Sequence, residues 1–102
     1  MVAGDAEQLT ATCQRAIETF ANELEPHFQI EEQALLPLLK ETDARPLVEH
    51  TLADHRQLRA LLAGLGRNRA DALADFAKCL SDHVRFEERE LFPALEGVLA
   101  DG

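Results

Sequence analysis

The sequence contains no tryptophan and no tyrosine, so the protein cannot hold a side-chain radical on either residue type. Its two cysteines, Cys13 and Cys79, are far apart and form no CxxC motif. This excludes a disulfide framework, a zinc ribbon, a dithiol redox site and covalently attached haem. We expect both cysteines to be reduced residues of the core.

Positive charge is also scarce, with 10 Lys and Arg residues against 19 Asp and Glu residues and a net charge of −9. A nucleic-acid site needs clustered cations, so we expect no nucleic-acid partner. No apolar run approaches the roughly 18 residues of a membrane span, and no signal-peptide pattern opens the chain. The sequence therefore predicts one cytoplasmic domain, over residues 1–102, with no membrane partner.

Few β-branched residues and little glycine or proline favour helices, and the sequence predicts an all-α fold. Apolar residues recur at helical spacing in three long segments that two short breaks separate. A capping box at Asp5 and a cap at Asn68 mark the starts of the first and third segments. The expected helices run from Asp5 to about Glu41, from Pro46 to 64–66, and from Asn68 to about Ala100.

The first and third helices contain an internal repeat. A shift of 56 residues aligns residues 16–39 with residues 72–95, and 10 of the 24 aligned positions are identical. The identical pairs include His27 with His83 and Glu31 with Glu87. Because the repeated unit is a single helix, we expect the two copies to face each other in a bundle.

The repeated histidine and glutamate fall on the apolar face of each helix. At 100° per residue, Glu31 lies about 40° from His27, and Phe20, Leu24 and Leu38 lie within about 60° of it. The second copy of the repeat has the same arrangement, and the middle helix adds one histidine to its own apolar face. Five ionisable residues are thus predicted to point into one core: His27, Glu31, His55, His83 and Glu87.

Burial of these five residues is costly unless a cation joins them. An unpaired buried carboxylate costs several kcal/mol, and two carboxylates in one apolar core also repel each other. A metal ion of charge 2+ or 3+ offsets both terms, because it binds carboxylate oxygens and neutral imidazole nitrogens. Three nitrogen and two oxygen ligands suit two ions bridged by Glu31 and Glu87 better than one structural zinc. We expect no catalytic nucleophile and no organic cofactor site.

Three other polar residues lie off this face. His50 is about 140° from His55 around the helix, so we expect it to be exposed. Glu32 and Glu88 are about 140° from the histidines of their own helices. We expect them to be exposed charges that solubilise the helices, with contacts to a ligand residue or a partner as the alternative.

Three segments of the chain resemble the bacterial hemerythrin-like (HHE cation-binding) domains. They are PHFQIEEQALLPLLK at 26–40, ADHRQLRALLA at 53–63 and DHVRFEERELFPALEG at 82–97. The resemblance covers nearly the whole chain. It implies an up-down helical bundle with a non-haem di-iron centre, in which Glu31 and Glu87 bridge the ions and His27, His55 and His83 are terminal ligands. Zinc or manganese would be the alternative metals.

The chain departs from the family pattern at its N-terminus. The pattern has a further helix, with another histidine, before the first HxxxE helix, whereas this sequence begins within the HxxxE helix. The domain is therefore expected to be incomplete at the N-terminus, with an upstream start or a fourth helix supplied by another chain. Three helices would leave an exposed apolar groove, so we predict a homodimer or a swapped assembly. The metal site would then be one histidine short, have an open coordination position, or take a ligand from a neighbour, for which His50 is a candidate.

The resemblance also implies a function. Members of the family bind dioxygen, sense oxygen or iron, store iron, or respond to nitric oxide and peroxide. Without Tyr or Trp, a radical relay for hydroxylation is excluded, so we expect no turnover, or at most a peroxide-directed or nitric oxide-directed activity. The alternatives are a helical interaction module stabilised by zinc, manganese or iron, and a metal-free helical adaptor.

Overall fold

The computed structural model describes residues 2–101, and all the regular structure within them is helical, which confirms the all-α prediction. The helices form three rods, one for each predicted segment. The first rod comprises α1 (Val2–Thr19), η1 (Phe20–Leu24), α2 (Glu25–Ile30), η2 (Glu31–Leu35) and η3 (Leu36–Leu39). The second rod is α3 (Arg45–Gly66), and the third comprises α4 (Ala70–Phe86), η4 (Glu87–Leu91) and α5 (Phe92–Asp101).

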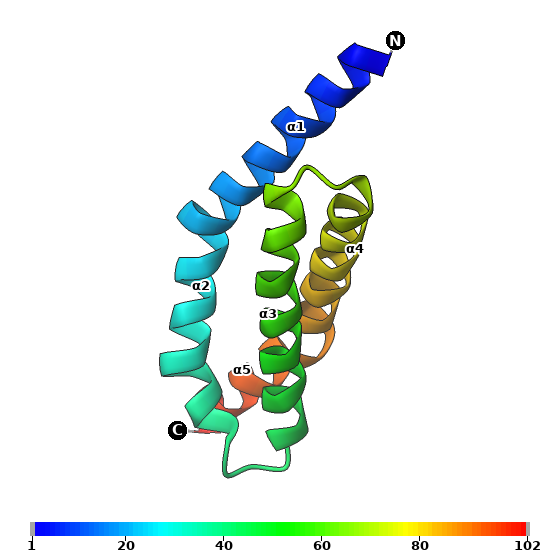
Figure 1. Ribbon diagram of the computed structural model, residues 1–102. Helices are drawn as coiled ribbons and strands as arrows, with labels where there is room; N and C mark the ends of the chain where they lie inside the picture. The colour runs from blue at the N-terminus through cyan, green and yellow to red at the C-terminus, as the bar shows by residue number, and fades with distance from the viewer. Residues whose placement is uncertain (1, 102) are drawn as a thin grey trace.

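The three rods pack side by side into an elongated molecule of 57 × 20 × 18 Å. Figure 1 shows α3 between the first rod and α4, while α5 crosses behind toward the end of the first rod. The N-terminal turns of α1 extend past the loop that joins α3 to α4. No described helix has the length and apolarity needed to cross a membrane.

The predicted helix starts were wrong at two places. The first rod is already helical at Val2, so Asp5 lies within α1 and does not cap it. Asn68 ends α3 instead of starting α4: its φ is 56°, and its amide donates to the Leu65 carbonyl. Asparagine tolerates this left-handed conformation, which lets the chain close a helix C-terminus. The prediction that Pro46 lies in the first turn of the second helix is confirmed.

Three π-helical segments interrupt the long rods, and they set which side chains are buried. A π-helical turn holds one residue more than an α-helical turn, so the buried face shifts by one position after each segment. The segments η2 and η4 begin at Glu31 and Glu87, which are equivalent in the repeat. The buried leucine that follows is Leu39 instead of Leu38, which is 41% exposed.

The segment η1 has no counterpart in the third rod. It begins at Phe20. The ring of Phe20 meets the ring of Phe28 edge to face, with 5.6 Å between their centres, so two helical turns take eight residues here. His27 is thereby displaced from the buried face, and its side chain is 48% exposed. In the uninterrupted α4, His83 lies seven residues after Phe76 and is 1% exposed. The prediction that His27 lies inside the apolar stripe was therefore wrong.

The core consists of two apolar clusters. One contains Cys13, Phe20, Phe28, Leu58, Leu65 and Phe76, and the other contains Leu36, Leu39, Val48, Leu91 and Leu95. Cys79 packs against the first cluster, and neither cysteine is in a disulfide, as predicted. On each rod, a short stretch of buried polar residues separates the two clusters.

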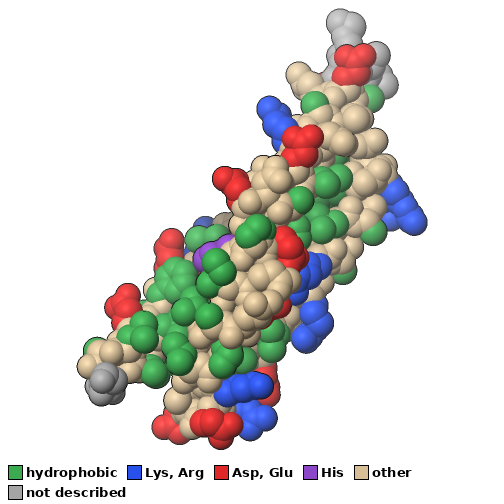
Figure 2. Space-filling view, turned by 90° about the vertical axis from the view of Figure 1, so that its left-hand side faces the viewer, with side chains coloured by type: hydrophobic (Ala, Val, Ile, Leu, Met, Phe, Trp, Pro, Cys, Tyr) green, Lys and Arg blue, Asp and Glu red, His purple; other side chains and the backbone are tan. Residues whose placement is uncertain are grey.

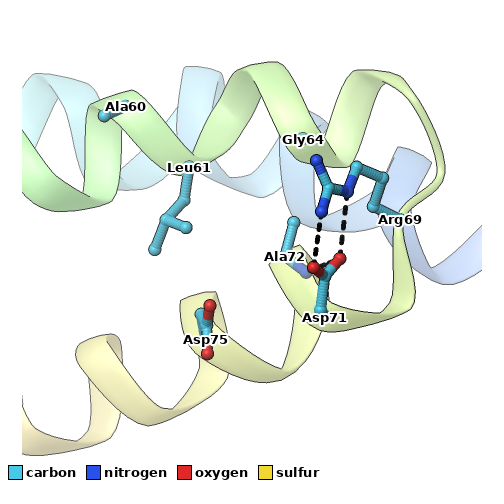
Figure 3. Close-up of a pocket in the computed structure, with 7 residues that line it drawn as sticks. All are labelled: Ala60, Leu61, Gly64, Arg69, Asp71, Ala72 and Asp75. Carbon is cyan, nitrogen blue, oxygen red and sulfur yellow. Dashed lines mark hydrogen bonds and ion pairs between the residues drawn. The ribbon is translucent and has the colours of Figure 1, made fainter.

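The helices α3 and α4 pack closely at Gly64. A Cβ atom at this position would lie 2.5 Å from the Cβ of Ala72 (Figure 3). We therefore expect Gly64→Ala to lower the free energy of unfolding by about 1–3 kcal/mol, although alanine favours helix, because the two helices would have to separate. Urea unfolding of the purified chain measures the change.

Gly97→Ala is the matched control. Gly97 lies in α5, and a Cβ there would meet nothing within 4 Å. This substitution is expected to raise stability by up to about 1 kcal/mol through helix propensity alone. Equal gains from both variants would contradict a close contact at Gly64.

Candidate metal centre

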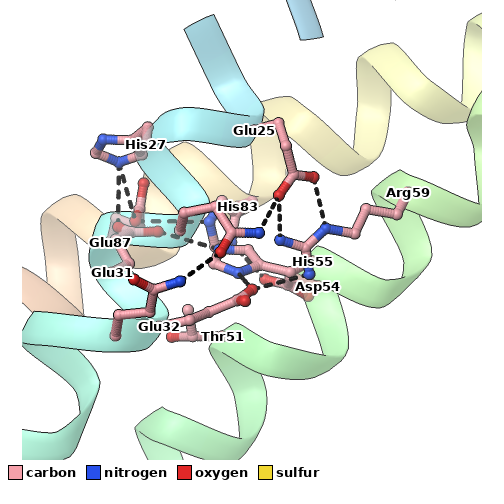
Figure 4. A network of polar contacts seen from close by, with 12 residues as sticks. Glu25, His27, Glu31, Glu32, Thr51, Asp54, His55, Arg59, His83 and Glu87 are labelled. Atoms are coloured by element: carbon pink, nitrogen blue, oxygen red, sulfur yellow. Dashed lines mark hydrogen bonds and ion pairs between the residues drawn. The ribbon is translucent and has the colours of Figure 1, made fainter. Parts of the chain in front are cut away.

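The five residues predicted as metal ligands come together between the two apolar clusters (Figure 4). Glu31 and Glu87 are the first residues of η2 and η4, and His55 and His83 lie within α3 and α4. These four residues are buried, whereas His27 lies at the exposed edge of the cluster. Two groups of three residues result, and Glu31 belongs to both.

The first group contains Glu31, His55 and His83. All three are buried, and each offers one ligand atom within 4.8 Å of the other two. The shortest separation is 3.1 Å, between His55 Nε2 and Glu31 Oε1. The three residues come from three different rods, so their convergence depends on the packing of the whole domain.

The second group contains His27, Glu31 and Glu87. His27 Nε2 lies 3.2 Å from Glu31 Oε2 and 3.9 Å from Glu87 Oε2. His83 Nε2 lies 3.5 Å from the same oxygen of Glu87. The two oxygens of Glu31 thus face different histidines, His55 on one side and His27 on the other.

Several buried atoms at the centre of the cluster have no hydrogen-bond partner among the described residues. They are both carboxylate oxygens of Glu31, Nε2 of His55, Nε2 of His83 and Oε2 of Glu87. Buried polar atoms are nearly always paired, and an unpaired one costs about 1–3 kcal/mol, more when it is charged. Oxygen and imidazole nitrogen atoms are also the ligands that divalent iron, zinc and manganese accept. The donor set therefore fits a metal cation.

The pKa shifts of the two glutamates also indicate that the cluster lacks positive charge. Burial raises the pKa of the Glu31 carboxyl, but its contacts with His55, Glu87 and His27 outweigh burial and hold the pKa below its ordinary value. Burial is the main cause that raises the pKa of Glu87, and the neighbouring Glu31 raises it further. One carboxylate is thus kept ionised at the expense of the other, as expected for two acids that share one site.

The pKa of His83 is shifted in the direction opposite to that expected for a buried imidazole without partners. Burial lowers the pKa of His83, but the carboxylates of Glu87 and Asp54 more than offset burial and raise it. The polar surroundings of His83 therefore favour positive charge at this point of the cluster.

Two further carboxylates contact the buried histidines from outside the cluster. Glu32 Oε2 lies 2.6 Å from Nδ1 of His55, and Asp54 Oδ2 lies 2.8 Å from Nδ1 of His83. The expectation that Glu32 is an exposed charge was wrong: its side chain is 21% exposed, because α3 packs against that side of η2. Its equivalent in the repeat, Glu88, is exposed as predicted.

For Glu32, the sequence indicated contact with a ligand residue only as the alternative, and for Asp54 it carried no signal. Glu32 and Glu88 are identical in the repeat, and only the position of α3 distinguishes them. Asp54 precedes His55 directly, so on a helical wheel it points away from the face that His55 occupies. It meets His83 only because α4 lies alongside α3.

An arginine continues the polar network beyond Glu32. Arg59 donates two hydrogen bonds of 2.8 Å to Glu25 and lies 2.9 Å from Glu32 Oε2. Its guanidinium also lies 5.7 Å from the centre of the Phe28 ring, and that ring stacks on His55 at 3.8 Å. One side of His55 is therefore held by an aromatic ring and by Glu32. Burial raises the pKa of Glu32, but its contacts with His55 and Arg59 outweigh burial and lower the pKa below its ordinary value.

His50 lies outside the cluster. Its side chain is 52% exposed, which confirms the expectation of a solvated histidine. Its ring also stacks on Phe86 at 3.8 Å, and its Nε2 lies 3.2 Å from Asp54 Oδ2. That it could serve as a ligand for a neighbouring chain stays a prediction.

Hydrophobic side chains are exposed on the surface around the cluster. Figure 2 shows them gathered on much of the face that the first rod presents. The exposed hydrophobic side chains of the described residues include Ile30 and Leu38 on the first rod, which are 59% and 41% exposed, and Val84 on α4, which is 42% exposed. The homodimer expected from the sequence stays a prediction, which light scattering on the purified chain would measure.

Comparison with known proteins identifies the family of the chain. No curated protein and no solved structure is similar enough to be matched. The model of one family, described as the hemerythrin HHE cation-binding domain, matches residues 2–95, which is nearly the whole chain and includes all five residues of the cluster. The chain therefore belongs to the hemerythrin HHE cation-binding domain family.

Proposed function

We propose that the cluster holds two iron ions and that the protein uses them to bind or sense dioxygen, peroxide or nitric oxide. His27, Glu31, His55, His83 and Glu87 would be the ligands, with the two glutamates shared between the ions. The observation that carries the proposal is the group of buried, unpaired nitrogen and oxygen atoms that point at one another from three rods. Family membership supports a cation as their partner.

Iron, when bound, would supply redox chemistry and affinity for small diatomic molecules. The protein would supply the surroundings. The two apolar clusters lie on either side of the polar layer and limit the access of water along the rods. His27 is half exposed, so its edge of the cluster is the side from which a small molecule can enter.

A second candidate function is a metal-stabilised interaction module. Imidazole and carboxylate ligands also accept zinc and manganese, so the donor set alone does not select iron. The exposed side chains of Ile30, Val84 and Leu99 favour this candidate, because exposed apolar surface often marks contact with another protein.

Metal analysis and a visible spectrum distinguish the two candidates. For the protein purified aerobically, we expect about two irons per chain and ferric charge-transfer absorption. A colourless protein with about one zinc per chain would favour the interaction module. A protein that binds no metal, and whose melting temperature chelators leave unchanged, would contradict both.

A further inference from the structure

We infer that Glu32 and Asp54 are positioning residues: each holds one buried histidine in the tautomer that carries its proton on Nδ1, and so directs the free electron pair on Nε2 into the cluster. The histidines concerned are His55 and His83. The value of this arrangement to the protein rests on the proposed metal-binding function. The tautomers themselves do not depend on it, because they exist in the metal-free chain.

The argument begins with the chemistry of the two contacts. An ionised carboxylate can only accept hydrogen bonds, so a ring nitrogen 2.6 Å from Glu32 or 2.8 Å from Asp54 must be the donor. A neutral imidazole has one N–H, and when Nδ1 bears it, Nε2 bears a lone pair. In both rings, Nε2 is buried in the cluster and makes no hydrogen bond of acceptable geometry, although it lies 3.1 Å from Glu31 Oε1 in His55 and 3.5 Å from Glu87 Oε2 in His83.

Aromatic packing fixes the plane of each ring. Phe28 stacks on His55 with 3.8 Å between ring centres and 12° between planes. The edge of the same phenylalanine meets His83 at 5.8 Å, and Phe86 lies 6.3 Å from His83 on another side. With the ring planes fixed by packing, the remaining choice is which nitrogen carries the proton, and the carboxylates make that choice.

The two carboxylates differ in their outer contacts. Glu32 also forms an ion pair with Arg59, a permanent cation that neutralises part of the negative charge of the carboxylate. Within the described part of the chain, Asp54 forms no ion pair with a lysine or arginine, and its ion-pair partners are the half-exposed His50 and the buried His83. Asp54 therefore places more uncompensated negative charge beside its histidine, and its removal is expected to have the larger effect.

Nitrogen NMR of the metal-free protein tests the tautomers directly. With 15N-labelled histidine, at a pH well above the raised pKa of His83 so that both rings are neutral, we expect His55 and His83 to show a protonated Nδ1 and an unprotonated Nε2. Glu32→Ala should change the pattern of His55 alone, and Asp54→Ala that of His83 alone. Glu32→Gln, which keeps an acceptor oxygen, should retain the tautomer of His55.

The repeat provides a matched control. Glu88 is the equivalent of Glu32, is exposed, and has no hydrogen bond to a histidine in the described structure, so Glu88→Ala should leave both rings unchanged. A protonated Nε2 on His55 and His83 of the unaltered protein would overturn the inference without any variant. So would a tautomer of His55 that is the same in Glu32→Ala as in the unaltered chain.

Cobalt(II) binding then measures the contribution to the site. We expect Glu32→Ala and Asp54→Ala to weaken cobalt binding about 10–100-fold, with Asp54→Ala the weaker binder, and Glu88→Ala to bind as the unaltered chain does. Affinity unchanged in both variants would overturn the positioning role. If the unaltered chain binds no cobalt, the proposed function fails, while the NMR result still decides the tautomers.

Discussion

Replacing His83 with alanine is expected to weaken metal binding by more than about 100-fold. His83 is almost fully buried, and its Nε2 points at Glu87 and at the Glu31–His55 group without a hydrogen bond. Its loss would remove a ligand itself, so the effect should exceed the 10–100-fold cost of losing an outer partner of a ligand. Iron counted per chain after gel filtration, together with titration of the metal-free protein, measures the loss.

His50→Ala is the control for this experiment. It removes an imidazole of the same chemistry from the neighbouring rod, but its ring is half exposed and stacks on Phe86 outside the cluster. We expect the metal content of His50→Ala to stay close to that of the unaltered chain. A metal content unchanged in both variants would remove His83 from the site, and an equal loss in both would indicate that His50 also contributes, as in a dimer.

The sequence alone predicted the three rods and the residues that converge between them. The repeat was the informative feature, because it placed a histidine and a glutamate at equivalent positions of two helices that a bundle brings together. Burial was then predicted correctly for Glu31, His83 and Glu87, each of which lies on a face that large apolar residues share.

His27 shows why the rest could not be predicted. A helical wheel assumes 100° per residue, but the π-helical turn η1 rotates less per residue, so the seven residues from Phe20 to His27 complete less rotation than in an α-helix. The third rod has no π-helical turn before His83, so two histidines at equivalent positions of the repeat differ from 48% to 1% in side-chain exposure. The composition of residues 20–24 carries no clear signal for a π-helical turn.

Glu32 illustrates a second limit. Its partner His55 is 23 residues away, and the contact depends on how the second rod packs against the first. Sequence periodicity describes the faces of one helix and not the rotation of its neighbour. The contact of Asp54 with His83, 29 residues apart, was hidden for the same reason.

Glu87→Gln is expected to change stability in opposite directions with and without metal. In the metal-free protein, the pKa of Glu87 is raised, so its ionisation at neutral pH opposes folding, and a neutral glutamine should raise the free energy of unfolding by about 1–2 kcal/mol. With metal at about 100 times its dissociation constant, binding stabilises the unaltered chain by about 2.7 kcal/mol. The variant, which lacks a ligand, should lose most of that gain. Urea unfolding with and without iron(II), under anaerobic conditions, measures both changes.

The adjacent Glu88 provides the control, because Glu88→Gln makes the same chemical change one residue away on an exposed position. Surface substitutions of this kind usually alter stability by less than about 0.5 kcal/mol, with or without metal. If Glu87→Gln alone stabilises the metal-free protein and destabilises the metal-bound protein, the Glu87 carboxylate is unfavourable when the cluster lacks a cation and favourable when it holds one. Destabilisation of Glu87→Gln under both conditions would instead identify Glu87 as a partner of the histidines, which needs no metal to be stable.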